Sequence, residues 1–199
     1  MKWFTLGIGV ALLFACLANA QTTTIITMRD ACDPASFNIA LGPGHCVPGQ
    51  HGNTLFADFI GELQSDQNAG AWRFNPMLNA TAGTFKLVRL DLTSGDQTNL
   101  VNKGGEVHTF TRVAQFGGGF KAKLNGLTGN PVPAPECAQV LPDGSLAPQP
   151  ESLKNQFVGA GATEAGPTAR TDIPLGVSYW QCCIHPWMRM VVVVHEHED

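Results

Sequence analysis

The stretch that most constrains this chain runs from Gln181 to Val194 and reads QCCIHPWMRMVVVV. It places Cys182, His185 and Met188 at short fixed intervals, and the four valines that follow are typical of a buried strand. A thiolate, an imidazole and a thioether are the ligands that favour copper in a trigonal site with a weak axial sulfur. Such a site needs a second imidazole from elsewhere in the chain.

The second imidazole is predicted to come from His108, in the segment GGEVHTF. The two glycines place this histidine at the start of a strand that follows a loop. The sequence therefore predicts one copper ion, with His108, Cys182 and His185 in a plane and Met188 as the axial ligand.

Residues 1–20 have the pattern of a secretory signal peptide. A charged start precedes an apolar run that is too short to span a bilayer, and small residues at 18–20 match a cleavage site. A lipoprotein site at Cys16 is the alternative. We expect an exported mature chain, 21–199, that lies in the periplasm or outside the cell, where disulfides persist.

The cysteine count fits a metal site in an exported protein. The chain has six cysteines, and removal of Cys16 with the signal leaves an odd number. If Cys182 binds a metal ion, the others suffice for two disulfides. Cys32 and Cys46 flank a short helical region, and a bridge between them would contribute about 3 kcal/mol to stability.

Short β-branched segments separated by glycine and proline predict an all-β fold, a Greek-key β-sandwich with short helical decoration near the N-terminus. The expected helices are 33–41 and 54–63. The expected strands are 22–28, 71–75, 84–92, 98–102, 107–113, 157–158, 168–173, 177–182 and 191–194.

The mature chain is predicted to be a single domain. Residues 21–70 hold the first strand and the helical decoration, and residues 71–199 form the copper-binding core. Residues 114–156 form one long Gly- and Pro-rich loop, and a structureless segment of that length is often functional. His45 and His51 are interpreted as solvated loop residues, because neither has a partner at ligand spacing.

Composition narrows the classes of function. The formal net charge is −4 and there is no basic block, so we expect no nucleic-acid partner. No further segment is apolar enough for a membrane helix. His195 and His197 are interpreted as a solvated terminus. No second Cys–His cluster, Ser/His/Asp arrangement or phosphate loop stands out, so the sequence predicts a protein that is not an enzyme.

The motif CCIHPWMR at 182–189 resembles the copper loop of the cupredoxins, the type 1 blue copper family of plastocyanin and amicyanin. Its short spacing, with Pro after His and Arg after Met, is most similar to amicyanin. Segments 102–110 and 176–181 resemble the family's first-histidine strand and penultimate strand. The resemblance covers roughly residues 71–113 and 157–195.

This resemblance implies a one-electron carrier that cycles between Cu(II) and Cu(I), and we expect it to be a monomer. It implies that His185 lies at the protein edge, where Pro186 and Trp187 form an apolar rim for a transient redox partner. Thr109 is expected to tether the ligand loops and to donate its N–H to the Cys182 sulfur. The alternatives are a copper carrier or reservoir, and a binding module without a redox role.

Two positions in the motif have alternatives. Only one of Cys182 and Cys183 can reach the copper, because neighbouring strand residues point to opposite faces. The family spacing favours Cys182, and Cys183 is then expected to pair with Cys137 in the long loop. Met190 is the alternative to Met188, because plastocyanin has a longer His-to-Met spacing.

Overall fold

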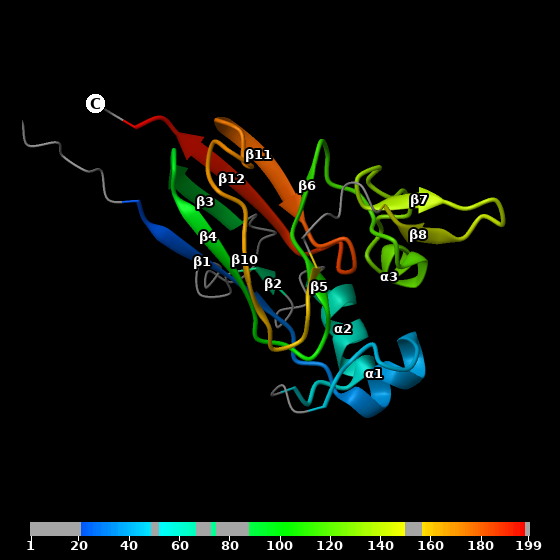
Figure 1. The fold of residues 1–199 in the computed structure, drawn as a ribbon. Coiled ribbons are helices and arrows are strands. Elements are labelled where there is room, and N and C mark those ends of the chain that lie inside the picture. The colour runs from blue at the N-terminus through cyan, green and yellow to red at the C-terminus, as the bar shows by residue number, and fades with distance from the viewer. Residues whose placement is uncertain (1–20, 49–51, 67–72, 75–87, 150–156, 198–199) are drawn as a thin grey trace, which may run out of the picture.

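The computed structural model describes residues 21–48, 52–66, 73–74, 88–149 and 157–197. The regular elements of these residues are mostly strands, arranged in two four-stranded and two two-stranded sheets with a few short helices (Figure 1). The prediction of an all-β sandwich is therefore confirmed. Within the described ranges, no helix is both long enough and apolar enough to cross a membrane.

The helices and strands follow one another along the chain as in Figure 1. They are β1 (Thr23–Arg29), α1 (Pro34–Leu41), α2 (Phe56–Asp66), β2 (Arg73–Phe74), β3 (Val88–Thr93), β4 (Gln97–Asn102), β5 (His108–Thr109), β6 (Thr111–Val113), α3 (Ala122–Leu127), β7 (Ala138–Val140), β8 (Leu146–Pro148), β9 (Phe157–Val158), β10 (Thr163–Ala165), β11 (Gly176–Gln181) and β12 (Arg189–His195).

The two larger sheets have the strand orders β10-β4-β1-β2 and β3-β12-β11-β6. Alternation along β3 shows why one face is buried: Val88, Leu90 and Leu92 are buried, whereas Arg89 and Asp91 are exposed. Apolar side chains from both sheets meet in one core cluster. The sheets therefore pack face to face, as a sandwich requires.

The helical decoration forms as predicted and packs on the rest of the protein. Asp33 caps α1, since its carboxylate accepts a hydrogen bond from the backbone N–H of Ser36 at 2.8 Å. The structure joins Cys32 to Cys46 in a disulfide, the predicted pair. The ring of Phe59, in α2, lies 5.4 Å from that of Trp187. The decoration therefore reaches the predicted copper loop.

The predicted strand at 168–173 is wrong. Ala169 and Ile173 form only an isolated bridge, and Arg170 between them has φ 72°, a left-handed conformation that breaks a strand. The strand of this region is β10, which pairs with β4. The predicted strands at 71–75 and 84–92 fall partly outside the described residues, which retain β2 and β3.

The long loop at 114–156 is not structureless. Its described part, up to residue 149, contains α3 and the hairpin of β7 and β8, which projects from the sandwich in Figure 1. The structure joins Cys137 to Cys183, the predicted pair, so this segment is tied to the end of β11. Prediction from composition failed here because glycine and proline also occur between short elements.

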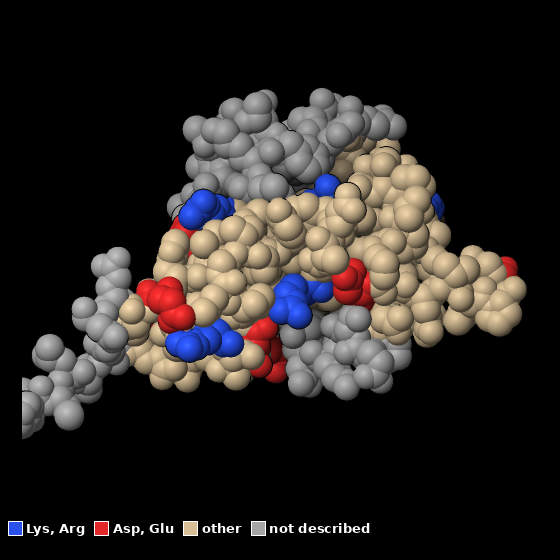
Figure 2. Space-filling view, turned by 90° about the horizontal axis from the view of Figure 1, so that it is seen from above, with Lys and Arg blue, Asp and Glu red and all other residues tan. Residues whose placement is uncertain are grey.

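Charged side chains are mixed on the surface that Figure 2 shows, where Lys and Arg lie close to Asp and Glu. Arg89 and Asp91, on the exposed side of β3, form an ion pair at 2.7 Å. This mixing agrees with the absence of a basic block in the sequence.

Candidate metal centre

Two segments distant in sequence bring the predicted planar ligands together. His108 begins β5, and Cys182 directly follows β11. Strands β11 and β12 are antiparallel with Gln181 opposite Arg189, so the intervening residues form a turn at one end of the sheet. The N–H of Cys182 donates to the carbonyl of Met188 at 3.0 Å, which closes this turn.

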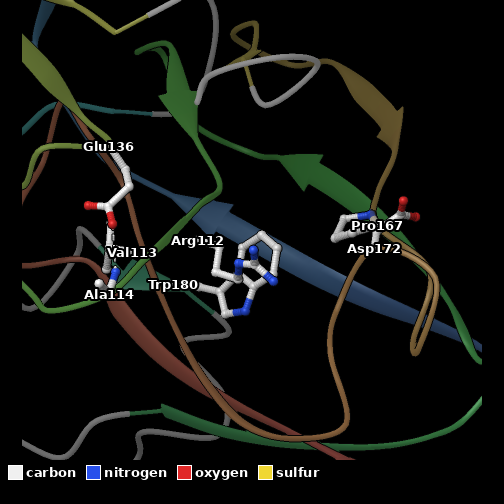
Figure 3. A pocket seen from close by; sticks show the side chains of 7 residues that line it. All are labelled: Arg112, Val113, Ala114, Glu136, Pro167, Asp172 and Trp180. Atoms are coloured by element: carbon white, nitrogen blue, oxygen red, sulfur yellow. Dashed lines mark hydrogen bonds between the residues drawn. The ribbon is translucent and has the colours of Figure 1, made fainter. Parts of the chain in front are cut away.

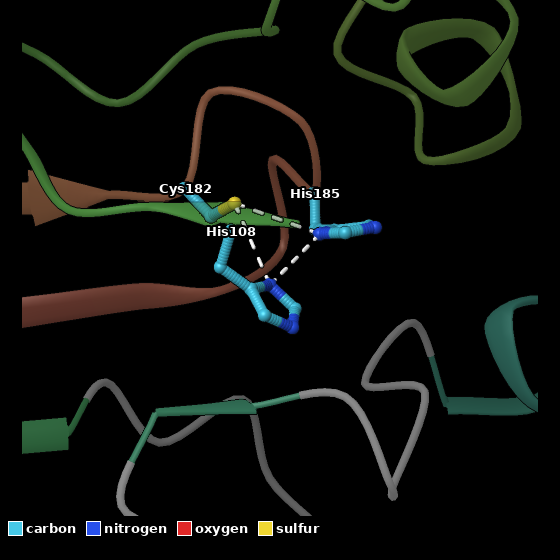
Figure 4. A group of neighbouring side chains, drawn as sticks. All are labelled: His108, Cys182 and His185. Carbon is cyan, nitrogen blue, oxygen red and sulfur yellow. Dashed lines mark hydrogen bonds between the residues drawn. The ribbon is translucent and has the colours of Figure 1, made fainter. Parts of the chain in front are cut away.

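The three ligand atoms form a compact triangle (Figure 4). The Cys182 Sγ lies 3.9 Å from Nδ1 of His108 and 3.5 Å from Nδ1 of His185, and the two nitrogens are 3.1 Å apart. A point in their plane is about 2 Å from all three atoms, close to a metal–imidazole bond and slightly short of a metal–thiolate bond. One metal ion can therefore contact all three.

Burial and mutual charge set the protonation of this triangle. Cys182 and His108 are 0% exposed and His185 is 1% exposed. Burial acts to raise the pKa of the Cys182 thiol, but His185 and His108 lower it well below its usual value. Burial lowers the pKa of His185, but Glu106 and Cys182 outweigh this and raise it to about 10. The cysteine is therefore held as a thiolate, the form that binds metal.

Carboxylates hold the outer nitrogens of both histidines. Asp30, just after β1, places Oδ2 at 2.9 Å from Nε2 of His108, and Glu106 contacts Nε2 of His185. Asp30 also accepts the N–H of Gly105 at 2.8 Å. A Cβ on Gly104 would lie 1.8 Å from Asp30 Oδ2, so only glycine fits there. These contacts turn both Nδ1 atoms toward the sulfur.

Thr109 makes both contacts expected of it. Its N–H donates to the sulfur of Cys182 at 3.3 Å, and its hydroxyl accepts the N–H of Cys183 at 2.7 Å. The strand that carries His108 is thus tied to the loop that carries the cysteine.

The alternative residues of the motif lie in different surroundings. The sulfur of Cys183 is bonded to Cys137, which leaves Cys182 as a free, buried thiol. Met188 is 1% exposed and lies in the turn with His185. Met190 instead lies within β12, opposite Trp180. The axial role of Met188 stays a prediction.

The expectation that His185 lies at the protein edge is wrong. His185 is 1% exposed, Trp187 is 6% exposed and Pro186 is buried, so the latter two do not form an exposed rim. The reason is the decoration: Phe59 packs on Trp187, and the ring of His45 lies 6.2 Å from that of His185. The resemblance did not extend to this region.

His45 is also not the solvated residue that the sequence suggested. Its side chain is 8% exposed, and its Nε2 lies 3.4 Å from a carboxylate oxygen of Glu106. His51 lies outside the described residues. Sequence reasoning missed Asp30, Glu106 and His45, and their spacing from the motif offers no signal that would have identified them.

A separate hollow of about 450 Å³ lies beside β6 and β11. Figure 3 shows Arg112 and Trp180 there, between Glu136 on one side and Asp172 on the other. Glu136 accepts the N–H of Ala114 at 2.9 Å. Among the described residues that line this hollow there is no Cys or His.

No family model and no curated protein sequence matches the chain. Similar solved structures include the Cu(I) form of an amicyanin mutant, 14% identical over 55% of this chain and 71% of that chain, with a TM-score of 0.30. A purple cupredoxin from Nitrosopumilus maritimus is 14% identical over 63% of this chain and 85% of that chain, with a TM-score of 0.31.

A copper-containing nitrite reductase from Thermus scotoductus is 15% identical, with a TM-score of 0.31, over 63% of this chain and 21% of that chain. At these identities and TM-scores the likeness carries no argument about what this chain does. The case for a metal centre rests on the triangle of His108, Cys182 and His185.

Proposed function

We propose that the protein is a type 1 copper protein that carries one electron to or from a partner protein. The observation that carries this proposal is the triangle of two Nδ1 atoms and one Sγ, with space for one ion at bonding distance from all three. Two imidazoles and one thiolate in a trigonal arrangement are the donor set of blue copper sites. Copper would supply a Cu(II)/Cu(I) couple there.

The surrounding residues would keep the ligands in place during electron transfer. Asp30 and Glu106 fix the orientation of the two rings, and Thr109 fixes the sulfur. All three planar ligands are buried, so water has little access to them. The geometry of a rigid site from which water is excluded changes little when the charge of the bound ion changes, and this favours fast electron exchange. Met188, in the same turn, would be the weak axial ligand.

Burial also favours an electron carrier over a copper carrier or reservoir. A protein that hands over copper needs an exposed, exchange-prone site, whereas His185 and Cys182 are closed off here. We further propose that the mature chain is exported, because two disulfides fit an oxidising compartment. A redox partner would bind transiently through a small interface.

The test is a visible and EPR spectrum of the mature protein after Cu(II) is added. We expect intense visible absorption from the bond between Cys182 and Cu(II). The Cys182→Ser and His108→Gln variants should lose this absorption, and His195→Gln, which changes an exposed histidine, should retain it. A colourless Cu(II) complex, or colour that survives in Cys182→Ser, would overturn the proposal.

Comparison of two rates separates the electron carrier from the copper carrier. We expect electron self-exchange to be fast and exchange of bound copper with a chelator to be slow. The reverse order would favour transport of copper.

A further inference from the structure

A second group of metal-ligating side chains lies directly against the first. His45, Glu106 and His185 each offer one ligand atom, and these atoms lie within 4.8 Å of one another. His185 belongs to both groups. In Figure 4 one ring nitrogen faces Cys182 and His108, while the other points away from them. That outer nitrogen, Nε2, faces Glu106.

The three side chains come from separate parts of the chain and converge on one point. His45 lies between α1 and the Cys32–Cys46 disulfide, and Glu106 precedes β5. The Nε2 of His45 is 3.4 Å from Oε1 of Glu106, and Nε2 of His185 contacts Oε2 of the same carboxylate. One carboxylate thus lies between two imidazole nitrogens.

Both nitrogens are buried beside Glu106. The Nε2 of His185 contacts the carboxylate directly, whereas the Nε2 of His45 lies 3.4 Å from it and makes no hydrogen bond with a described residue. A buried polar atom without a hydrogen bond is costly, and a bound ion would remove that cost.

The donor set and its access suit a small divalent ion. Two imidazole nitrogens and one carboxylate oxygen are ligands for zinc or Cu(II), and three protein ligands leave a fourth position open. One of the three ligands, His45, also lines a hollow of about 300 Å³, together with Phe120 and Ile184 among others.

We propose that His45, Glu106 and His185 bind a second divalent metal ion, of the zinc or Cu(II) class, and that the imidazole ring of His185 bridges this ion to the copper. The inference rests on the proposed copper site. The second ion takes the place of the proton on His185 Nε2, so one proton leaves for each ion bound. No electron is transferred in this step.

The experiment uses mature protein loaded with one equivalent of Cu(II), to which Zn(II) is then added. We expect one further zinc per chain by metal analysis after dialysis. Because the ring of His185 is shared, we also expect the visible and EPR spectra of the copper to shift as zinc binds. The His45→Ala and Glu106→Gln variants should bind zinc at least 10-fold more weakly, and the copper colour of His45→Ala reports that this variant is folded.

A variant with both His195→Ala and His197→Ala is the matched control, because these exposed histidines near the C-terminus offer an adventitious zinc site. It should bind zinc as the unmodified protein does. Copper colour without a second bound ion would overturn the bridged pair alone, as would zinc binding that survives in His45→Ala or disappears in the control. Absence of copper colour would overturn the proposed function and the bridge together.

Discussion

The carboxylate of Asp30 lies 2.9 Å from Nε2 of His108, and both side chains are completely buried. Burial acts to raise the pKa of Asp30, but His108 and the backbone N–H groups of Gly105 and Glu106 lower it overall. The carboxylate is therefore charged, and it fixes the ring so that Nδ1 points to the sulfur of Cys182.

Asp30→Asn should weaken copper binding by about 10- to 100-fold, because an uncharged amide holds the ring of His108 less firmly. Competition with a chelator of known affinity measures this effect. Asp33→Asn is the matched control, since Asp33 caps α1 and asparagine caps helices about as well. Equal copper affinity in the two variants would show that the contact with His108 does not support the site.

Met188→Leu should change the EPR spectrum of the copper protein and raise its reduction potential, because loss of a thioether donor favours Cu(I). Met190→Leu makes the same chemical change in β12 and should leave both properties as they are. Protein-film voltammetry of the two variants measures the potentials. An effect confined to Met190→Leu would assign the axial position to that residue instead.

Thr109→Val should lower the free energy of unfolding by about 1–3 kcal/mol, because the buried N–H of Cys183 loses its acceptor. Thr109→Ser retains the hydroxyl and should lose less. Urea unfolding of the metal-free proteins compares the two variants. If both lose the same free energy, the hydrogen bond is not the cause.

Metal-free protein should lose stability as the pH falls below about 6.5. His45 has a pKa of about 4 in the folded chain, mainly through burial and against the charge of Glu106, so the unfolded chain binds its proton first. The difference from the ordinary value of 6.5 corresponds to roughly 3 kcal/mol, lost by pH 4.

Urea unfolding at pH 7 and pH 4 measures this loss, and His45→Gln should show a smaller one, because glutamine does not titrate. An equal pH dependence in the two proteins would assign the acid sensitivity to other groups.

The sequence predicted those features of the site that depend on residues near one another in the chain. The spacing of Cys182, His185 and Met188 is read directly from one turn, and the pair of glycines before His108 marked the strand that completes the triangle. Thr109 followed from its place beside that histidine. Each of these predictions depends on residues adjacent in the chain or on one strand.

The sequence did not predict what depends on packing between distant segments. Asp30 meets His108 across 78 residues, and His45 reaches Glu106 from the decoration. The periodicity of the sequence does not indicate such contacts, so it did not predict that the helical decoration buries His185. The predicted strand at 168–173 is wrong for a local reason. Arg170 has a left-handed conformation, which is unusual for a residue other than glycine.

Because Cys182 and Cys183 are adjacent, either sulfur could form a disulfide with Cys137 when the protein matures. Cys137 bonded to Cys183 leaves one thiolate, correctly placed between two imidazoles. Cys137 bonded to Cys182 would consume that thiolate and produce a chain unable to hold the ion at its centre. Correct oxidation must therefore come before, or be guided by, metal loading, and an isomer with the wrong bridge would be a folded product without colour.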